Sequence, residues 1–173
     1  MIISLVGLPG SGKSTVGRQL ARRLQLHFSD SDQIIEQRIG CPIREYFERE
    51  GETSFRDIEE QVLDELTQQS GVLSTGGGAV LRDANRQRLH TRGKVVYLKS
   101  TPEELMRRLR HDTQRPLLQV GDPLQRLREL YAVRDPLYRE TAHFVIDTGR
   151  PSVATLVNMI VMQLELAGVV PQN

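Results

Sequence analysis

Apolar and polar positions along the chain predict strands and helices that follow one another in turn. Residues 2–6 form a short apolar run, largely β-branched, which predicts a strand buried on both faces. Downstream, Val16, Leu20 and Leu24 recur at a spacing of four, as on one face of a helix. Similar apolar runs predict further strands at 26–30, 72–75, 94–99 and 143–147.

Capping and stop residues predict where the other helices begin and end. Two carboxylates flank Ser31, the predicted cap of a helix that ends at Gly40. A longer helix after Gly51 is predicted to end at Gly71. Further helices are predicted from Pro42, at 81–89, from Thr101-Pro102 to 110, from Pro123 to 142, and after Ser152.

Residues 7–14, Gly-Leu-Pro-Gly-Ser-Gly-Lys-Ser, match the G-x-x-x-x-G-K-[ST] phosphate-binding loop between the first strand and the first helix. Glycines let the backbone approach phosphate oxygens closely, and the helix N-terminus adds unpaired N–H groups. Lys13 is expected to contact the outer phosphates. A turn that binds nothing is the alternative, but every fixed position matches in the expected context. The predicted nucleotide ligands in this segment are Gly10, Ser11, Gly12, Lys13, Ser14 and Thr15.

Strands that alternate with helices predict a three-layer α/β/α domain built on a parallel sheet. The 173 residues fit a single domain, 1–173. Ligands in such sheets bind beyond the carboxyl ends of the strands. Asp30, Gly76 and the phosphate loop are therefore expected to converge.

Charge and composition narrow the range of partners. Lysine and arginine number 23 against 22 acidic residues, so the net charge of +1 argues against nucleic acid as a partner. Cys41 is the single cysteine, which excludes an internal disulfide and is compatible with a reducing cytosol. Asn158, Gln163 and Glu165 interrupt the apolar C-terminal stretch, which therefore predicts an amphipathic helix and no membrane span. We expect a cytoplasmic protein.

The phosphate loop alone is compatible with a GTPase switch, a transport ATPase or a small-molecule kinase. The chain has no Asn-Lys-x-Asp guanine-reading sequence, and its Leu-Ser-Thr-Gly-Gly-Gly segment follows a strand, unlike a transporter signature. An insertion at 32–60 and an arginine-rich, polar lid at 111–122 favour a kinase that closes over two substrates. Closure would exclude water, which otherwise hydrolyses ATP.

Six segments together resemble the shikimate kinase family, of the nucleoside monophosphate kinase structural class. They follow the family's order along nearly the whole chain: Gly7 to Thr15, Asp30-Ser31-Asp32, Phe55-Arg56-x-x-Glu59, Ser74-Thr75-Gly76-Gly77-Gly78, Arg115-Pro116-Leu117-Leu118 and Arg134-x-x-x-Tyr138. The resemblance implies phosphate transfer from ATP to the 3-hydroxyl of shikimate, on the route to chorismate and the aromatic amino acids. It also implies a five-stranded sheet of order 2-3-1-4-5, a requirement for Mg²⁺ and a monomer.

The resemblance assigns the substrate carboxylate to Arg56 and Arg134, and guanidinium forks suit a carboxylate. Glu59, one helical turn from Arg56, is expected to orient it. Asp32 is expected to hydrogen-bond the ring hydroxyls, either orienting the attacking oxygen or removing its proton. Backbone N–H groups of Gly76, Gly77 and Gly78 are expected to face the substrate.

The remaining predicted ligands serve the nucleotide and the metal. Arg115, in the lid, is expected to neutralise charge on the transferring phosphoryl group, which makes it a catalytic residue with Lys13 and Asp32. Arg107 or Arg108, and the turn at Arg150, are expected near the adenine. No aspartate ends the third strand, so Asp30 is the predicted partner of Ser14 for Mg²⁺.

Other functions stay open from the sequence. A kinase for another small acid, such as gluconate, would share the loop and the fold. A nucleotide-dependent regulatory module would bind ATP without transferring phosphate. An RNA-linked ATPase is disfavoured by the near-zero net charge and by the 5% content of aromatic residues.

Overall fold

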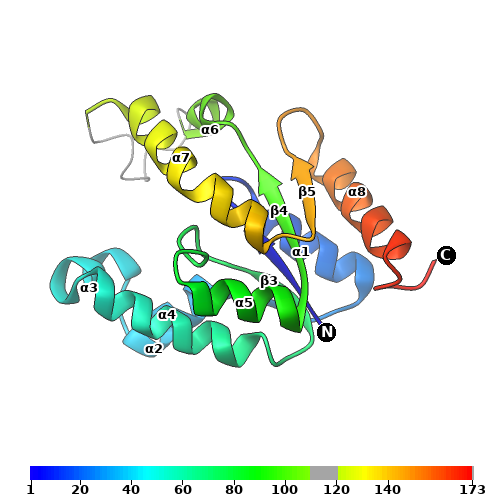
Figure 1. The fold of residues 1–173 in the computed structure, drawn as a ribbon, viewed down its shortest axis with the longest axis horizontal. Coiled ribbons are helices and arrows are strands. Elements are labelled where there is room, and N and C mark those ends of the chain that lie inside the picture. The colour runs from blue at the N-terminus through cyan, green and yellow to red at the C-terminus, as the bar shows by residue number, and fades with distance from the viewer. Residues whose placement is uncertain (110–120, 173) are drawn as a thin grey trace.

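Five parallel strands form one sheet in the order β2-β3-β1-β4-β5, as predicted (Figure 1). The computed structural model describes residues 1–109 and 121–172. Each strand is followed by a helical connection, which is how parallel strands are joined. The strands are β1 (Ile2–Val6), β2 (Phe28–Asp30), β3 (Gly71–Ser74), β4 (Gly93–Lys99) and β5 (Phe144–Asp147).

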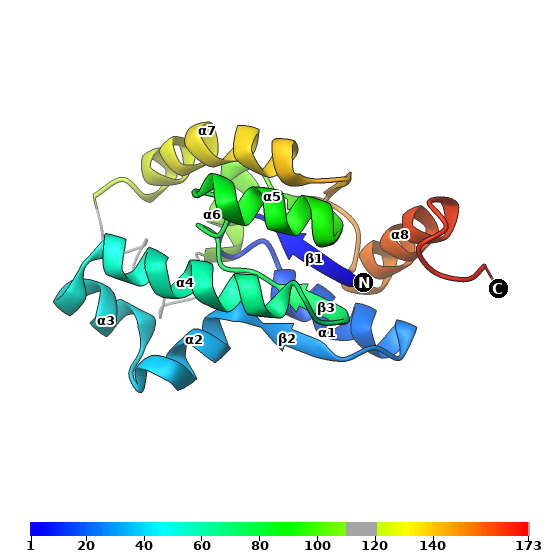
Figure 2. The same cartoon turned by 60° about the horizontal axis from the view of Figure 1, so that its bottom comes forward.

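Helices cover both faces of the sheet and complete the predicted three layers (Figures 1 and 2). Helices α1 and α8 pack on one face, while α4, α5 and α7 pack on the other. Helices α2 and α3 extend beyond the sheet beside α4. The bounds are α1 (Lys13–Leu24), α2 (Ser31–Ile39), α3 (Ile43–Glu50), α4 (Glu52–Leu66), α5 (Asp83–Arg92), α6 (Pro102–Leu109), α7 (Pro123–Thr141) and α8 (Val153–Leu166).

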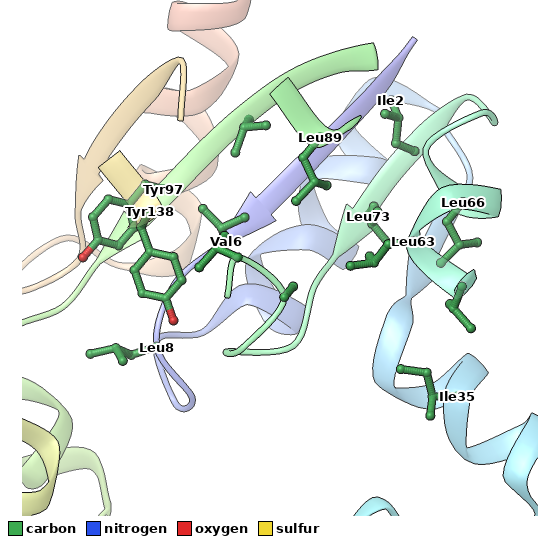
Figure 3. Packing of buried hydrophobic residues seen from close by; sticks show 14 of the residues in the cluster. Ile2, Val6, Leu8, Ile35, Leu63, Leu66, Leu73, Leu89, Tyr97 and Tyr138 are labelled. Carbon is green, nitrogen blue, oxygen red and sulfur yellow. The ribbon is translucent and has the colours of Figure 1, made fainter. Parts of the chain in front are cut away.

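The central strand β1 contributes to both halves of the core because its side chains alternate between the two faces. Ile3 and Leu5 pack against α1 and α8. Ile2 and Val6 pack on the opposite face with residues of α4, α5 and α7, and Figure 3 shows part of this cluster. A strand buried on both faces fixes the phosphate loop that follows it on a rigid support.

Two local predictions were wrong. Ser31 does not cap α2, because Asp30 is the cap: it has extended backbone angles and its carboxylate accepts hydrogen bonds from the amides of Asp32 and Gln33. Gly71 does not end the preceding helix, which stops at Leu66, and instead begins β3. A Cβ at Gly71 would collide with the His27 carbonyl.

The predicted lid at 111–122 lies almost entirely outside the described residues. Before it, α6 begins at a capping box in which Thr101 and Glu104 each accept a hydrogen bond from the other's amide. At its other end, Asp122, the last residue of this segment, caps α7, whose first residue is Pro123. Among the described residues, no helix combines the length and the hydropathy needed to cross a membrane.

Ser4, in the middle of β1, provides a test of core energetics. It is fully buried, and its hydroxyl has no hydrogen-bond partner among residues 1–109 and 121–172. Because an unpaired buried hydroxyl costs free energy, we expect Ser4→Ala to keep or raise the free energy of unfolding, by up to about 1 kcal/mol. Urea unfolding of the purified variant measures this change.

Val6→Ala is the matched control, since Val6 is also fully buried and lies two residues further along β1, on the same face of the sheet. It removes apolar contacts only and should lower the free energy of unfolding by roughly 1–3 kcal/mol. A comparable loss for Ser4→Ala would mean that the Ser4 hydroxyl is bonded in solution.

Candidate active site

The phosphate loop connects β1 to α1 through backbone conformations that require glycine. Gly10 and Gly12 have φ values of +85° and +94°, in the left-handed region that side chains disfavour. Gly12 ends the loop, and α1 begins at the next residue, Lys13. The amino group of Lys13 donates hydrogen bonds to the carbonyls of Gly7 (2.7 Å) and Leu8 (2.9 Å). The lysine is therefore folded over the loop that it is predicted to serve.

Three oxygen-bearing side chains meet beside the start of α1. The Ser14 hydroxyl donates to Asp30 Oδ2 at 2.7 Å and lies 3.3 Å from the hydroxyl of Ser74, the last residue of β3. The other Asp30 oxygen caps α2. Mg²⁺ prefers oxygen ligands and usually keeps several waters, so Ser14 and Asp30 fit such an ion. No group of three or more His, Cys, Asp or Glu residues suited to a metal occurs within the described ranges.

The loop and the ends of β2 and β3 enclose a cavity of about 510 Å³. Its wall includes Lys13, Ser14, Asp30 and Gly76, so the predicted convergence at the carboxyl ends of the strands is confirmed. A second cavity of about 190 Å³ lies under α3, α4 and α7. The two cavities have four wall residues in common: Pro9, Asp32, Gly76 and Gly77.

Asp32 stands at the junction of the two cavities. Burial raises the pKa of its carboxyl to about 6, and the nearby charges of Glu59 and Asp30 act in the same direction. Lys13 opposes the rise. A carboxylate with this pKa is mainly ionised at neutral pH yet is more basic than an exposed aspartate, as a proton acceptor requires.

Two arginines and a buried glutamate form the wall of the smaller cavity. Arg56 of α4 donates from Nη1 to Glu59 at 2.9 Å, and the exposed fractions of the two side chains are only 12% and 1%. Burial raises the pKa of Glu59, and the Arg56 charge opposes that rise. Arg134 reaches the same cavity from α7. The arrangement offers two cations to an anionic group of a small ligand.

Each glycine of the 76–78 segment faces a different predicted ligand residue. A Cβ at Gly76 would lie 2.6 Å from Asp32 Oδ1. One at Gly77 would lie 2.6 Å from the Pro9 ring and 3.2 Å from Arg134, and one at Gly78 would collide with the Arg56 guanidinium. Any side chain here would displace these groups, which explains the glycine run.

The amides of the three glycines are not equivalent, contrary to expectation. The Gly76 amide already donates to Ser31 Oγ at 3.2 Å, so its bond joins β3 to α2. The amides of Gly77 and Gly78 donate to no acceptor in the part of the chain that the structure describes. Of the three amides, those of Gly77 and Gly78 are left for the predicted role of backbone donors to a ligand.

The arginines predicted to lie near the adenine have different surroundings in the structure. Arg108 Nη1 reaches the Gly10 carbonyl at 3.3 Å, and its Nη2 donates to the Thr148 carbonyl at 3.0 Å. This guanidinium therefore joins the phosphate loop to the turn after β5. Arg107 and Arg150 are exposed and belong to neither cavity wall. Arg115 lies outside the described residues.

The structure adds wall residues that sequence reasoning did not assign. Ile43, Phe47 and Phe55 give the smaller cavity an apolar side, and the two phenyl rings are 5.4 Å apart. Pro9 belongs to the walls of both cavities, although the phosphate-loop pattern allows any residue at its position. Apolar spacing does not distinguish Phe47 and Phe55 from other apolar helix residues, because it does not reveal which of them border a cavity.

Comparison with known proteins places this site in a family. A family model described as shikimate kinase matches residues 9–165. A shikimate kinase from Paracidovorax citrulli is 64% identical over 175 residues, which cover 99% of this chain and 96% of that protein. A shikimate kinase from Acinetobacter baumannii, solved in complex with shikimate, has 48% identity and a TM-score of 0.89, covering 96% of this chain and 93% of that one.

A gluconokinase from Sinorhizobium meliloti has a TM-score of 0.60 at 19% identity, covering 95% of this chain and 91% of that one, and so shares the fold alone. The family model and the high identities extend over nearly all of the sequence that carries the two cavities. The chain belongs to the shikimate kinase family.

Proposed function

We propose that this protein transfers the γ-phosphate of ATP to the 3-hydroxyl of shikimate, giving shikimate 3-phosphate and ADP. One observation carries the proposal: the phosphate cavity and the arginine-lined cavity meet at Asp32, Gly76 and Gly77. A donor phosphate on the loop and an acceptor hydroxyl in the smaller cavity would then lie next to each other. Holding two reactants in this way lowers the entropic part of the barrier.

Asp32 accepts the proton of the attacking hydroxyl as the new O–P bond forms and the bond to the ADP oxygen breaks. The raised pKa of Asp32 supports this role, because it results mainly from burial of the carboxylate at the place where the two cavities join. Lys13, buried at the start of α1, supplies positive charge to the phosphates. Arg115 is proposed to contribute a further charge from the lid at 111–122.

Arg56 and Arg134 hold the substrate carboxylate, and the ion pair with Glu59 keeps Arg56 in place. The insertion at 32–60 carries Asp32, Arg56 and Glu59, so it supplies much of the acceptor site. Phe47 and Phe55 exclude water from the apolar side of the ring. The amides of Gly77 and Gly78 are proposed as the backbone donors.

Mg²⁺ is the proposed metal, with Ser14 and Asp30 as its protein ligands. When bound, it would neutralise charge on the nucleotide phosphates. Arg107 and Arg150 are retained as proposed nucleotide contacts at the edge of the site. The near-neutral charge supports a protein without a nucleic-acid partner, and the single cysteine supports a reducing, cytoplasmic location. We propose that the enzyme acts as a monomer.

A coupled ADP-release assay tests the proposed function directly. With ATP and Mg²⁺ present, shikimate should stimulate ADP release, and gluconate at the same concentration should not. Phosphorylation of gluconate instead would favour a different small-acid kinase with the same fold. Nucleotide binding without any acceptor-dependent turnover would identify a binding module.

Arg134→Ala should raise the KM for shikimate roughly 10- to 100-fold, because a charge-assisted hydrogen bond to the carboxylate is lost. The KM for ATP should change little, since Arg134 is not part of the wall of the phosphate cavity. Steady-state kinetics with each substrate varied in turn measure both constants.

Arg139→Ala is the control on the same helix, because Arg139 is exposed and pairs with Asp135 at 3.0 Å. It should leave both constants near their original values. An equal rise in the shikimate KM for both variants would remove Arg134 from the proposed carboxylate site.

Asp32→Asn should abolish most turnover and yet stabilise the unliganded protein above pH 6. The folded-state pKa of about 6 exceeds the ordinary value of 3.8, so the folded state binds more protons between these two values. The protonated carboxyl of Asp32 therefore makes its whole contribution to the free energy of unfolding below pH 3.8. This contribution is lost as the pH rises through 6 and the carboxyl ionises in the folded state. At pH 8 the substitution should raise the free energy of unfolding by up to about 3 kcal/mol.

Thermal unfolding of both proteins at pH 4 and pH 8 measures the effect, which should be larger at pH 8. Asp147→Asn serves as the control because the Asp147 side chain is 83% exposed. An identical melting-temperature difference at the two pH values would contradict the raised pKa of Asp32.

A further inference from the structure

The peptide that joins Gly77 to Gly78 is held from one side by a tyrosine of α7. The Tyr138 hydroxyl donates a hydrogen bond to the Gly77 carbonyl at 2.5 Å, across 61 positions of sequence. The carbonyls on either side have local partners: the Gly76 carbonyl accepts from the Ala79 amide and the Gly78 carbonyl from the Leu81 amide, both at 3.1 Å. Tyr138 is thus the long-range contact that fixes the middle of this turn.

The orientation of this carbonyl determines where the next amide points. The described part of the chain has no cis peptide bond, and in a trans peptide the C=O and N–H groups point in opposite directions. With the Gly77 carbonyl directed at Tyr138, the Gly78 N–H points away from that tyrosine. Gly78 is buried in the wall of the smaller cavity. Its amide is one of the two glycine N–H groups that lack an acceptor within 1–109 and 121–172.

A peptide between two glycines needs such a restraint. Without side chains, both residues reach several backbone conformations at similar cost, so the peptide plane can rotate. The Pro9 ring and Arg134 occupy the space where a Gly77 side chain would stand, but this crowding does not fix the direction of the carbonyl. The Tyr138 hydroxyl supplies the directional bond that distinguishes one peptide orientation from the other.

Tyr138 itself is well fixed. Its side chain is fully buried, and its ring lies 4.9 Å from the ring of Tyr97, a pair that Figure 3 shows beyond the end of β1. Burial raises the pKa of the Tyr138 phenol, against the opposing charge and hydrogen bond of Arg134. The phenol therefore keeps its proton and remains a donor to Gly77. The phenol also hydrogen-bonds Arg134, which is the cation proposed to hold the substrate carboxylate.

We propose that Tyr138 is a positioning residue that locks the Gly77–Gly78 peptide with the Gly78 N–H facing the bound acceptor. The inference rests on the proposed function, since it assigns this amide to shikimate. Tyr138 would not contact the substrate through its own hydroxyl. It would act through the peptide, and its loss would weaken the binding of shikimate more than the binding of ATP.

Tyr138→Phe tests the proposal, because it keeps the ring and removes only the hydroxyl. We expect the KM for shikimate to rise about 5- to 10-fold, close to the effect of one hydrogen bond, while kcat and the KM for ATP change less than about twofold. Tyr97→Phe is the matched control: its ring belongs to the same pair, but its hydroxyl donates to Asp135 at 2.7 Å. It should leave the KM for shikimate unchanged.

An NMR titration of the ¹⁵N-labelled protein with shikimate provides a second readout that general destabilisation would not reproduce. In the unmodified protein the Gly78 amide signal should move on binding, and in Tyr138→Phe that movement should be reduced. A Gly78 signal that does not respond in the unmodified protein would overturn the inference, even if Tyr138→Phe fails to fold.

The kinetic outcomes separate the two proposals. If the unmodified protein has no shikimate-dependent turnover, the proposed function fails. If it turns over normally and Tyr138→Phe matches it in the KM for shikimate, the proposed function stands and the positioning role is wrong. Equal effects of Tyr138→Phe and Tyr97→Phe would also contradict the role, because they would point to packing of the ring pair.

Discussion

The close approach of three backbone segments at the carboxyl edge of the sheet is the constraint on which the site depends. The phosphate loop after β1, the start of α2 after β2 and the glycine segment after β3 meet there because β1, β2 and β3 are neighbouring parallel strands. The contact of Gly77 with Pro9 is so tight that no side chain fits between them. This backbone proximity places the two cavities next to each other, with Pro9, Asp32, Gly76 and Gly77 in both walls.

Burial of carboxylates at this edge of the sheet costs folding stability, but it also makes Asp32 a better proton acceptor. Burial raises the pKa of the Asp32 carboxyl, and the nearby charge of Glu59 disfavours its ionisation further. Arg56 offsets part of the cost for Glu59 through a buried ion pair. Among residues 1–109 and 121–172 no ion pair holds Asp32, and although the Lys13 charge opposes the rise, its carboxylate stays more basic than an exposed aspartate. A ligand hydroxyl that donates a hydrogen bond to the Asp32 carboxylate would favour its ionised form. Ligand binding would then be linked to folding stability.

Hydrogen bonds between distant segments keep the geometry rigid. Asp30 is used twice, once to cap α2 and once to accept from Ser14, so the start of α2 is tied to the phosphate loop. Ser31 ties the same helix to Gly76, and Arg108 ties the loop to the turn after β5. These bonds join elements whose sequence separations range from 16 to 98 residues. Rigid placement of reacting groups is what phosphoryl transfer demands of a protein.

The sequence by itself determined the phosphate loop and the strand–helix alternation. Those features depend on local chemistry: glycine at left-handed positions, β-branched runs in buried strands and apolar residues at helical spacing. Resemblance of six segments to a known family supplied the strand order and the acceptor. It also singled out Arg56 and Arg134, which lie on different helices and would otherwise look like surface residues.

Only the tertiary structure decided which of these groups are available to a ligand and which already make hydrogen bonds within the protein. The Ser31 hydroxyl pairs with the Gly76 amide, so neither the expected cap nor the expected donor exists there. The Tyr138 contact with Gly77 joins residues 61 positions apart. Hydrogen-bond partners and burial depend on contacts between distant segments, and residue spacing along the chain carries no information about them. The sequence therefore specified the chemical groups of the site, and the packing of the sheet edge specified their orientation and their pKa values.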